Sequence, residues 1–315
     1  MPITRSNRFA NPVTRPVPDE DASVLGQFIP IHYHYNMLLD ELRMEAFRNA
    51  IQAVIRPGMR VVELGGGTGI LSFLAARCGA KVWCVERNAA LVECARKAIR
   101  NNGVESSVTV VHEDASEFIP PEPIDAVICE MLHVGLLREK QADVIASFKN
   151  NYRSHYGNRL PRFLPEASLL TFQLLEYPFL FSGYHVPVPV FQSPTPNQPG
   201  IELSELKSYG QVFYDEEYPQ SFRWSGCMTS HQSGQFSAIR FITQNLIAID
   251  IEKQVSYPWP NQFLLMPIES PISIEEGQSI HIDFSYQAGA SLESLSESIR
   301  INPDRASEPT RRMAA

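Results

Sequence analysis

The sequence contains no apolar run long enough to cross a membrane, since a spanning helix needs about 20 such residues. Its first twenty residues carry prolines and charges but no apolar stretch, so the pattern of a secretory signal is missing. Cysteine is scarce and odd in number, and the five residues show no C-x-x-C spacing. These absences predict a cytoplasmic protein with reduced cysteines and no membrane contact.

Basic charge and metal-ligand spacing are lacking as well. The formal net charge is −8, so we expect no nucleic-acid partner, because tracking phosphates requires clustered lysine and arginine. No group of histidines and cysteines has zinc spacing, so no metal is predicted. Hydrophobic residues make up 44% of the 315 residues, which allows a sizeable core in two domains or one large one.

The first half of the chain alternates between strand and helix patterns. Residues 1–30 are rich in proline and charge, and we expect an N-terminal arm that is partly disordered. A helical periodicity then runs from Asn36 to Ile55, and short apolar strands and amphipathic helices follow in turn. This alternation predicts an α/β domain over residues 31–160 with a mainly parallel sheet.

The pattern changes near residue 160, where the helices end. The remaining strand-like stretches are SLLTFQLLEY, FSAIRFITQNLIAIDIEKQV, QFLLMPI and QSIHIDFSYQ. They predict a β-rich domain over residues 161–300, a barrel or a sandwich, for substrate binding or dimerisation. Proline cannot donate to a strand ladder, so the Pro-rich residues 184–200 are expected to form an excursion or arm. Residues 301–315 are polar and predict a disordered tail.

A glycine-rich loop joins the first expected strand to the next helix, in VVELGGGTGILSFLAARCGAKVWCVE. Glu63, Gly65, Gly67 and Gly69 form the pattern E-x-G-x-G-x-G, whose glycines allow a tight turn and close approach of a ligand. A phosphate-binding P-loop would end in Gly-Lys-Ser/Thr, and a dinucleotide fingerprint would read G-x-G-x-x-G. Neither is present, so the loop favours S-adenosylmethionine, a nucleoside cofactor without phosphate.

Two acids follow the next strands and complete the expected cofactor site. Glu86 ends the second strand, and its two carboxylate oxygens suit the two ribose hydroxyls. Asp114 comes after the third strand, where it is placed for the adenine amine, with Ala115 beside it. The strand, the glycine-rich loop, the helix and the acids therefore together predict one site for a nucleoside cofactor.

With these residues the sequence resembles the protein arginine methyltransferases, class I enzymes with a Rossmann-like domain and a C-terminal β-barrel. The resemblance rests on HYHYNMLLDELRMEAFRNAI, ELGGGTGILSFLAARCGAKV and CEMLHVGLLRE. It implies that Arg43 pairs with the cofactor carboxylate and that Met37 crowds the methyl acceptor. It also implies that Glu130 and Glu139, nine residues apart, clamp a substrate guanidinium from a hairpin-like loop.

The chemistry of guanidinium fits such a pair. The group is planar, always charged and carries five fixed donors, so two carboxylates can hold it through paired, charge-assisted hydrogen bonds. Methyl transfer is an in-line displacement, and holding one nitrogen in position accounts for most of the catalysis. Taken alone, Glu130 would be an acid at a sheet edge and Glu139 a solvated helix residue.

The sequence departs from the family at several places. Phe28 stands where the second tyrosine of an aromatic motif is expected, and MLH follows Glu130 where the family has Trp-Met-Gly. His133, between the acids, is either a further base or substrate contact, or a buried and hydrogen-bonded histidine. Tyr257 and Trp259 stand near the family's Thr-His-Trp loop, where they would meet the substrate, but the histidine is lost.

The sequence thus predicts an S-adenosylmethionine-dependent N-methyltransferase acting on a guanidino nitrogen of arginine. The expected partner is an arginine-containing protein, a peptide or a guanidino small molecule. One alternative is a small-molecule or natural-product N-methyltransferase on the same fold, and another is a non-catalytic regulator that binds the cofactor. The Pro-rich residues 184–200 stand where the family has its dimerisation arm, so a homodimer contact and a plain loop both remain open.

Overall fold

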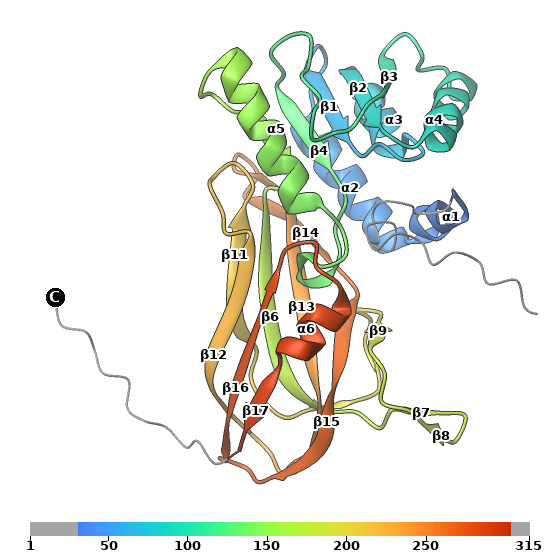
Figure 1. Ribbon diagram of the computed structural model, residues 1–315. Coiled ribbons are helices and arrows are strands. Elements are labelled where there is room, and N and C mark those ends of the chain that lie inside the picture. Colours follow the sequence, from blue (N-terminus) through green and yellow to red (C-terminus); the bar gives the residue numbers. More distant parts are fainter. Residues whose placement is uncertain (1–30, 304–315) are drawn as a thin grey trace, which may run out of the picture.

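The computed structural model describes residues 31–303, which form an α/β part and an antiparallel β part joined end to end (Figure 1). The predicted N-terminal arm with Phe28, and the chain from residue 304 onward, lie outside these residues. Across residues 31–303 no helix is long and apolar enough to cross a membrane. The same residues include no group of three or more histidine, cysteine or acidic side chains placed to hold a metal ion.

The α/β part is built on a parallel five-stranded sheet, in the order β3-β2-β1-β4-β5. Its strands are β1 (Arg60–Leu64), β2 (Lys81–Glu86), β3 (Val108–His112), β4 (Ala126–Cys129) and β5 (Arg162–Leu164). The predicted alternation is confirmed for β1 to β4, and β5 adds a strand just beyond residue 160. Because parallel strands end at a common edge, the residues that follow β1, β2, β3 and β4 meet there.

The helical stretch predicted over residues 36–55 is wrong as a single helix. The structure has α1 (Ile31–Leu39) and α2 (Glu41–Val54), separated at Asp40. The backbone of Asp40 is extended, and its carboxylate accepts a hydrogen bond from the Arg43 N–H at 3.0 Å. This is an N-cap, which begins a new helix and places Arg43 in its first turn. The other helices of this part are α3 (Ile70–Arg77), α4 (Ala89–Asn101) and α5 (Gln141–Tyr156).

The β part consists of a seven-stranded and a three-stranded antiparallel sheet. The larger sheet contains β6 (Ala167–Glu176), β9 (Val190–Gln192), β10 (Ile201–Glu202), β11 (Lys207–Phe213), β13 (Gly234–Asp250), β14 (Val255–Pro260) and β15 (Phe263–Ile274). The smaller contains β12 (Ser221–Thr229), β16 (Ser279–Gln287) and β17 (Arg300–Asn302). A hairpin of β7 (Leu180–Phe181) and β8 (Tyr184–His185) projects from the β part, and the short helix α6 (Leu292–Ser298) packs on β16 (Figure 1). The four strands predicted from the sequence are β6, β13, β15 and β16.

An aromatic core joins the two antiparallel sheets. Phe172 on β6 meets Trp224 on β12 with ring centroids 4.8 Å apart, and Phe284 on β16 at 5.2 Å. The rings meet edge to face, the arrangement that aromatic quadrupoles favour. Phe172 has no exposed surface, so it lies at the centre of this core.

The core of the β part continues into the α/β part without a break. At the junction Phe47 on α2 meets Trp259 on β14 edge to face, with ring centroids 6.0 Å apart. Both side chains are buried. The junction therefore fixes α2, and with it Arg43, against the β part.

Replacing Phe172 by alanine should lower the free energy of unfolding by about 3–5 kcal/mol, because it opens a cavity between the sheets. Leu169 on the same strand points outward and is 41% exposed, so Leu169→Ala should change stability by about 0.5 kcal/mol or less. Urea titration followed by circular dichroism measures both variants. Equal losses would show that the two sheets do not pack through Phe172.

Candidate active site

The glycine-rich loop after β1 adopts a backbone that only glycine tolerates well. Gly65, Gly67 and Gly69 have φ angles of 73°, 54° and 82°, all in the left-handed region. A Cβ on Gly67 would lie 3.0 Å from the ring of His34 on α1. The loop therefore combines left-handed turns with close packing under α1. Gly69 ends the loop as the N-cap position of α3.

Glu63 lies beneath this loop and holds the start of α3. Its carboxylate accepts hydrogen bonds from both the backbone N–H and the hydroxyl of Ser72, the former at 2.9 Å. Burial raises the pKa of Glu63 to about 7, although the bonds from Ser72 act in the opposite direction. Glu63 thus supports the loop from below and also lines the smaller cavity described next.

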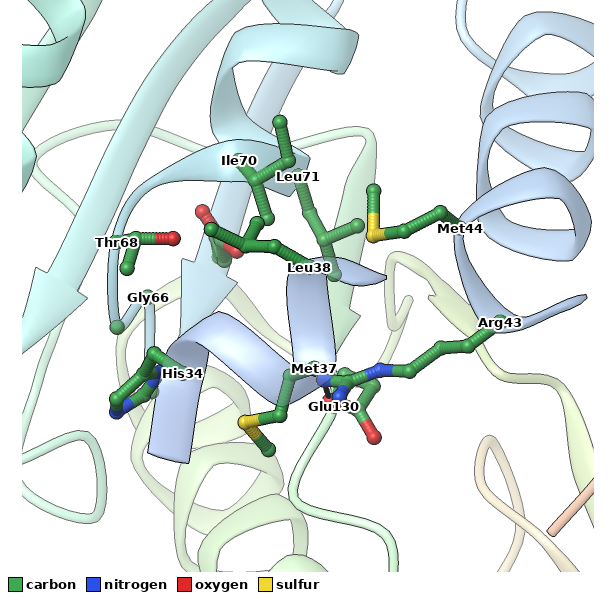
Figure 2. A pocket seen from close by; sticks show the side chains of 13 residues that line it. His34, Met37, Leu38, Arg43, Met44, Gly66, Thr68, Ile70, Leu71 and Glu130 are labelled. Carbon is green, nitrogen blue, oxygen red and sulfur yellow. Dashed lines mark ion pairs between the residues drawn. The ribbon is translucent and has the colours of Figure 1, made fainter. Parts of the chain in front are cut away.

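Two cavities meet at the edge where the parallel strands end. The smaller, about 50 Å³, is lined by Arg43, Glu63, Gly65, Gly67, Glu130 and others (Figure 2). The larger, about 310 Å³, is lined by Glu86, Asp114, Ala115, Glu130 and Glu139 among others. His34, Met37, Gly65 and Glu130 line both cavities. The structure therefore brings most of the predicted cofactor residues and both glutamates to one place.

The two acids predicted for the nucleoside have different surroundings. Glu86 accepts hydrogen bonds from the Gly67 N–H at 2.9 Å and the Asn88 N–H at 2.7 Å, one on each carboxylate oxygen. Each of these oxygens keeps a second lone pair for a ligand. Asp114 accepts from the backbone and hydroxyl of Ser116 and forms an ion pair with Arg87 at 3.4 Å. Their assignments to the ribose and the adenine stay predictions.

The chain reverses between the two glutamates, in a segment we call the acid loop, residues 130–139. Gly135, Leu136 and Arg138 all have left-handed φ angles, of 69°, 55° and 64°. The N–H of Glu139 donates to the Leu137 carbonyl at 2.7 Å, so Arg138 occupies the centre of a strained three-residue turn. This reversal returns Glu139 to the cavity that Glu130 lines.

The β part holds the acid loop through its backbone. The N–H of Gly135 donates to the Thr243 hydroxyl at 2.7 Å, and the Tyr286 hydroxyl donates to the Gly135 carbonyl at 2.9 Å. Asn261 donates its side-chain amide to the Leu132 carbonyl at 3.2 Å. The loop that carries Glu139 is therefore shaped by residues more than a hundred positions away in the sequence.

Glu130 forms a buried ion pair with Arg43 (Figure 2). The side chains are 4% and 14% exposed, respectively. Burial lowers the pKa of Arg43 to about 10, so the guanidinium stays charged at neutral pH. Arg43 also lies near the ring of Trp259, 5.9 Å from its centroid. The arginine predicted for the cofactor carboxylate is thus in contact with one of the two predicted clamp acids.

Glu139 has no comparable partner among the described side chains. Burial raises its pKa to about 7, and the charges of Arg43 and Arg138 oppose this increase only in part. Glu139 therefore takes up a proton more readily than an exposed carboxylate does. The two acids differ, since Glu130 is paired with an arginine and Glu139 is not paired with any described side chain.

The remaining predicted residues line neither cavity. His133 packs edge-on against Phe191 with ring centroids 5.2 Å apart, and burial lowers its pKa to about 4. It is therefore neutral at physiological pH. Trp259 packs on Phe47 and Arg43, so it supports the arginine, and Tyr257 on β14 packs against the core.

His34 is the residue that the sequence analysis missed. Its Nε2 is buried and has no hydrogen-bond partner within residues 31–303, and the ring lies over Gly67. Burial lowers its pKa, and Glu86 raises it in part. A buried nitrogen without a partner beside a glycine cradle fits a cofactor that brings hydroxyl groups. The sequence could have indicated this role, because His34 lies three residues before Met37, so the two side chains share one helix face and His34 reaches the same site as Met37.

Comparison with known proteins agrees with this geometry. A family described as a methyltransferase domain matches residues 61–154. An uncharacterised protein from Methanothermobacter thermautotrophicus is 30% identical over 272 residues, which is 85% of this chain and 97% of that protein. An arginine N(omega)-methyltransferase from Streptomyces achromogenes is 32% identical over 126 residues, 38% of this chain and 35% of the relative.

Solved structures agree on the fold. The structure of Arabidopsis thaliana protein arginine methyltransferase 10 aligns with a TM-score of 0.68 and 16% identity, covering 80% of this chain and 87% of that one. The predicted fold class is confirmed, with a Rossmann-like α/β part followed by a separate antiparallel β part. The chain belongs to the family of the Methanothermobacter protein, as a divergent, arginine methyltransferase-like class I enzyme that uses S-adenosylmethionine.

Gly67→Ala should weaken binding of S-adenosylhomocysteine by at least about tenfold, because the new Cβ strains the loop and pushes on His34. Gly103 is the matched control, since its φ is also left-handed, at 66°, but nothing lies within 4 Å of an added Cβ. Gly103→Ala should lose about 1 kcal/mol of stability and bind the cofactor normally. Calorimetric titration distinguishes them, and equal affinity of the two variants would contradict the cofactor assignment.

Proposed function

We propose that this enzyme methylates a guanidino nitrogen of arginine, in a protein, a peptide or a small molecule. One observation carries the proposal: Glu130 and Glu139 line the same cavity as Gly65 of the glycine-rich loop and Glu86. An acceptor with fixed positive charge and several donors suits two carboxylates there. The Streptomyces relative, named for arginine, supports the same acceptor chemistry.

The two acids would play different parts. S-adenosylmethionine supplies an electrophilic methyl group on its sulfonium when bound. Glu130, held by Arg43, provides a fixed oxygen against which one edge of the acceptor guanidinium can rest. Glu139 takes the other edge and draws positive charge away from the reacting nitrogen. After transfer that nitrogen must lose a proton, and the Glu139 carboxylate, with a pKa of about 7, is suited to accept it.

Arg43 would connect the acid to the cofactor. It lines the smaller cavity together with the glycine-rich loop, where the resemblance puts the cofactor carboxylate. A guanidinium has five donors and can serve two carboxylates at once. Holding Glu130 with one edge leaves the other for the cofactor. The same residue would then fix the methyl donor and the acceptor relative to each other.

Transfer of an isotopically labelled methyl group tests the proposal directly. The protein is incubated with labelled cofactor and with arginine-containing peptides or free arginine, and mass spectrometry locates the label. We expect the label on a guanidino nitrogen, and both Glu130→Gln and Glu139→Gln should lower its rate of transfer by at least about a hundredfold. Label on another group, or full activity of Glu130→Gln, would show that the acid pair does not clamp a guanidinium.

The rate should also depend on the ionisation of Glu139. Only the carboxylate form attracts a guanidinium, so kcat/KM for the acceptor should rise with pH through an apparent pKa of about 7. In kcat the apparent pKa should fall, because a bound cation favours the ionised form. Glu139→Gln should lose roughly a hundredfold in rate and lose this ionisation.

Glu63 provides the control for that profile. Its pKa is also raised to about 7, but its carboxylate is bound to Ser72 beneath the loop. The ionisation should persist in Glu63→Gln and vanish in Glu139→Gln. A profile that keeps its step in Glu139→Gln would assign the titration to another group and contradict the clamp.

Two other functions remain as alternatives. A small-molecule or natural-product N-methyltransferase is favoured by the altered acid loop, where MLH replaces the family's Trp-Met-Gly. A cofactor-binding regulator without catalysis would bind S-adenosylmethionine but methylate no acceptor. Glu130, buried, and Glu139, half-buried, disfavour the regulator, because carboxylates drawn out of water are costly to keep without a use.

We also propose that the β7–β8 hairpin contacts a second copy of the chain. Leu180 and Tyr184 at the hairpin are 56% and 71% exposed, and α1 presents exposed leucines. Exposed apolar side chains gathered on a projecting element often mark an interface. Sedimentation should show a dimer that Leu180→Ser with Tyr184→Ser dissociates. Ile251→Ser, at an exposed apolar residue elsewhere, should leave it intact.

A further inference from the structure

Arg138 is a charged residue of the acid loop that forms no ion pair with any of the described side chains. It directly precedes Glu139 and has a left-handed φ of 64° in the strained turn. Within residues 31–303 its guanidinium makes no ion pair and donates no hydrogen bond. The guanidinium lies over the ring of Phe191 on β9, whose centroid is 5.8 Å away. By contrast, the half-exposed Arg60 and Arg153 each form an ion pair with an acid.

The position of Arg138 links it to the acid pair. Its charge acts on Glu139 and on His133, and the groups that act on it in turn are Glu139, Glu293 on α6 and the Tyr33 hydroxyl on α1. Neither acid is close enough for an ion pair. Tyr33 and Phe191 both expose part of their rings. Arg138 therefore stands at the margin of the site, between α1 and β9.

A guanidinium that lies over an aromatic ring and has no counter-ion within residues 31–303 suits a carboxylate. The strained turn that contains Arg138 also favours a binding role. Backbone strain persists only where the surrounding structure imposes it, and such strain often marks a functional site. The backbone N–H of Arg138 is bound to the Ala290 carbonyl at 2.8 Å, so the β part fixes this turn. The backbone of the turn is thus fixed, and the guanidinium lies over the Phe191 ring.

We propose that Arg138 binds a carboxylate of the methyl acceptor, so that the acceptor carries a guanidinium and a carboxylate one arginine side chain apart. This rests on the proposed function. In free arginine the two groups sit at opposite ends of one side chain. Glu139 lines the larger cavity, while Arg138 lines neither cavity, so the guanidinium end of such an acceptor would lie in the cavity and its carboxylate end at the margin. The acceptor class is then free arginine or a peptide that ends in arginine, and not an internal arginine of a basic segment.

The test compares L-arginine with agmatine, which has the same guanidino group but no carboxylate. Wild-type enzyme should prefer L-arginine by roughly ten- to a hundredfold in kcat/KM, the range for a charge-assisted hydrogen bond. Measured at a pH well above 7, where Glu139 is ionised with or without the nearby charge of Arg138, Arg138→Gln should remove this preference and methylate agmatine as the wild type does. Arg138→Lys should restore part of it. Arg223→Gln, on the exposed side of β12, removes one positive charge elsewhere and should keep the preference.

Two further arms identify the source of the carboxylate. Short peptides ending in arginine are compared as free acids and as amides, and a preference for the free acid extends the subsite to peptide ends. Calorimetry with S-adenosylhomocysteine should show equal affinity for wild type and Arg138→Gln. A loss of cofactor affinity in Arg138→Gln would assign this arginine to the cofactor and overturn the proposal.

The failures of the two proposals are distinguishable. Equal methylation of L-arginine and agmatine by the wild type, or an equal loss with both in Arg138→Gln, overturns the carboxylate subsite and leaves guanidino methylation standing. Methylation of internal arginines alone has the same consequence. If the wild type methylates no guanidino compound, the proposed function fails and this inference fails with it.

Discussion

The buried ion pair between Arg43 and Glu130 organises the site. It joins the first turn of α2 to the residue that follows β4, and so ties the helices ahead of the cofactor loop to the parallel sheet. Two buried charges are energetically acceptable only when they pair with each other. Removing one partner of such a pair lowers the free energy of unfolding by about 3–5 kcal/mol. Trp259 packs near the arginine from the β part, so both halves of the chain support the same contact.

The α/β part and the β part contribute different features to the site. The parallel sheet brings the glycine-rich loop, Glu86 and Glu130 to one edge, which is what any class I methyltransferase needs for its cofactor. The second acid depends on the β part, because Thr243, Asn261 and Tyr286 hold the acid loop by its backbone. The β part therefore shapes the loop that carries Glu139, and with it one side of the proposed acceptor site.

Much of this could be predicted from local sequence. Strand, glycine loop, helix and terminal acid are consecutive, so their pattern indicates both the fold and the cofactor edge. The spacing of Glu130 and Glu139 pointed to a reversal, which the left-handed residues of the acid loop provide. The helix break was also readable in principle, since Asp40 is a favoured N-cap residue.

What the sequence could not show depends on distant contacts. The hydrogen bond from Gly135 to Thr243 joins residues 108 positions apart, and no periodicity indicates such a pairing. For His133 the sequence left open a base or substrate contact and a buried, hydrogen-bonded histidine. Only the fold shows that its ring packs edge-on against Phe191 and that its Nδ1 lies 3.3 Å from the Val134 carbonyl. The pairing of Arg43 with Glu130 was missed because the resemblance assigned each residue to a different ligand.

The central claim is that Glu130 and Glu139 together hold a guanidinium in front of the methyl donor. A crystal structure with S-adenosylhomocysteine and an arginine acceptor measures this most directly. We expect one acceptor nitrogen to face the cofactor sulfur, and both carboxylates to accept hydrogen bonds from the remaining guanidinium N–H groups. An acceptor guanidinium bound away from Glu139, with Glu130 in contact only with Arg43, would contradict it.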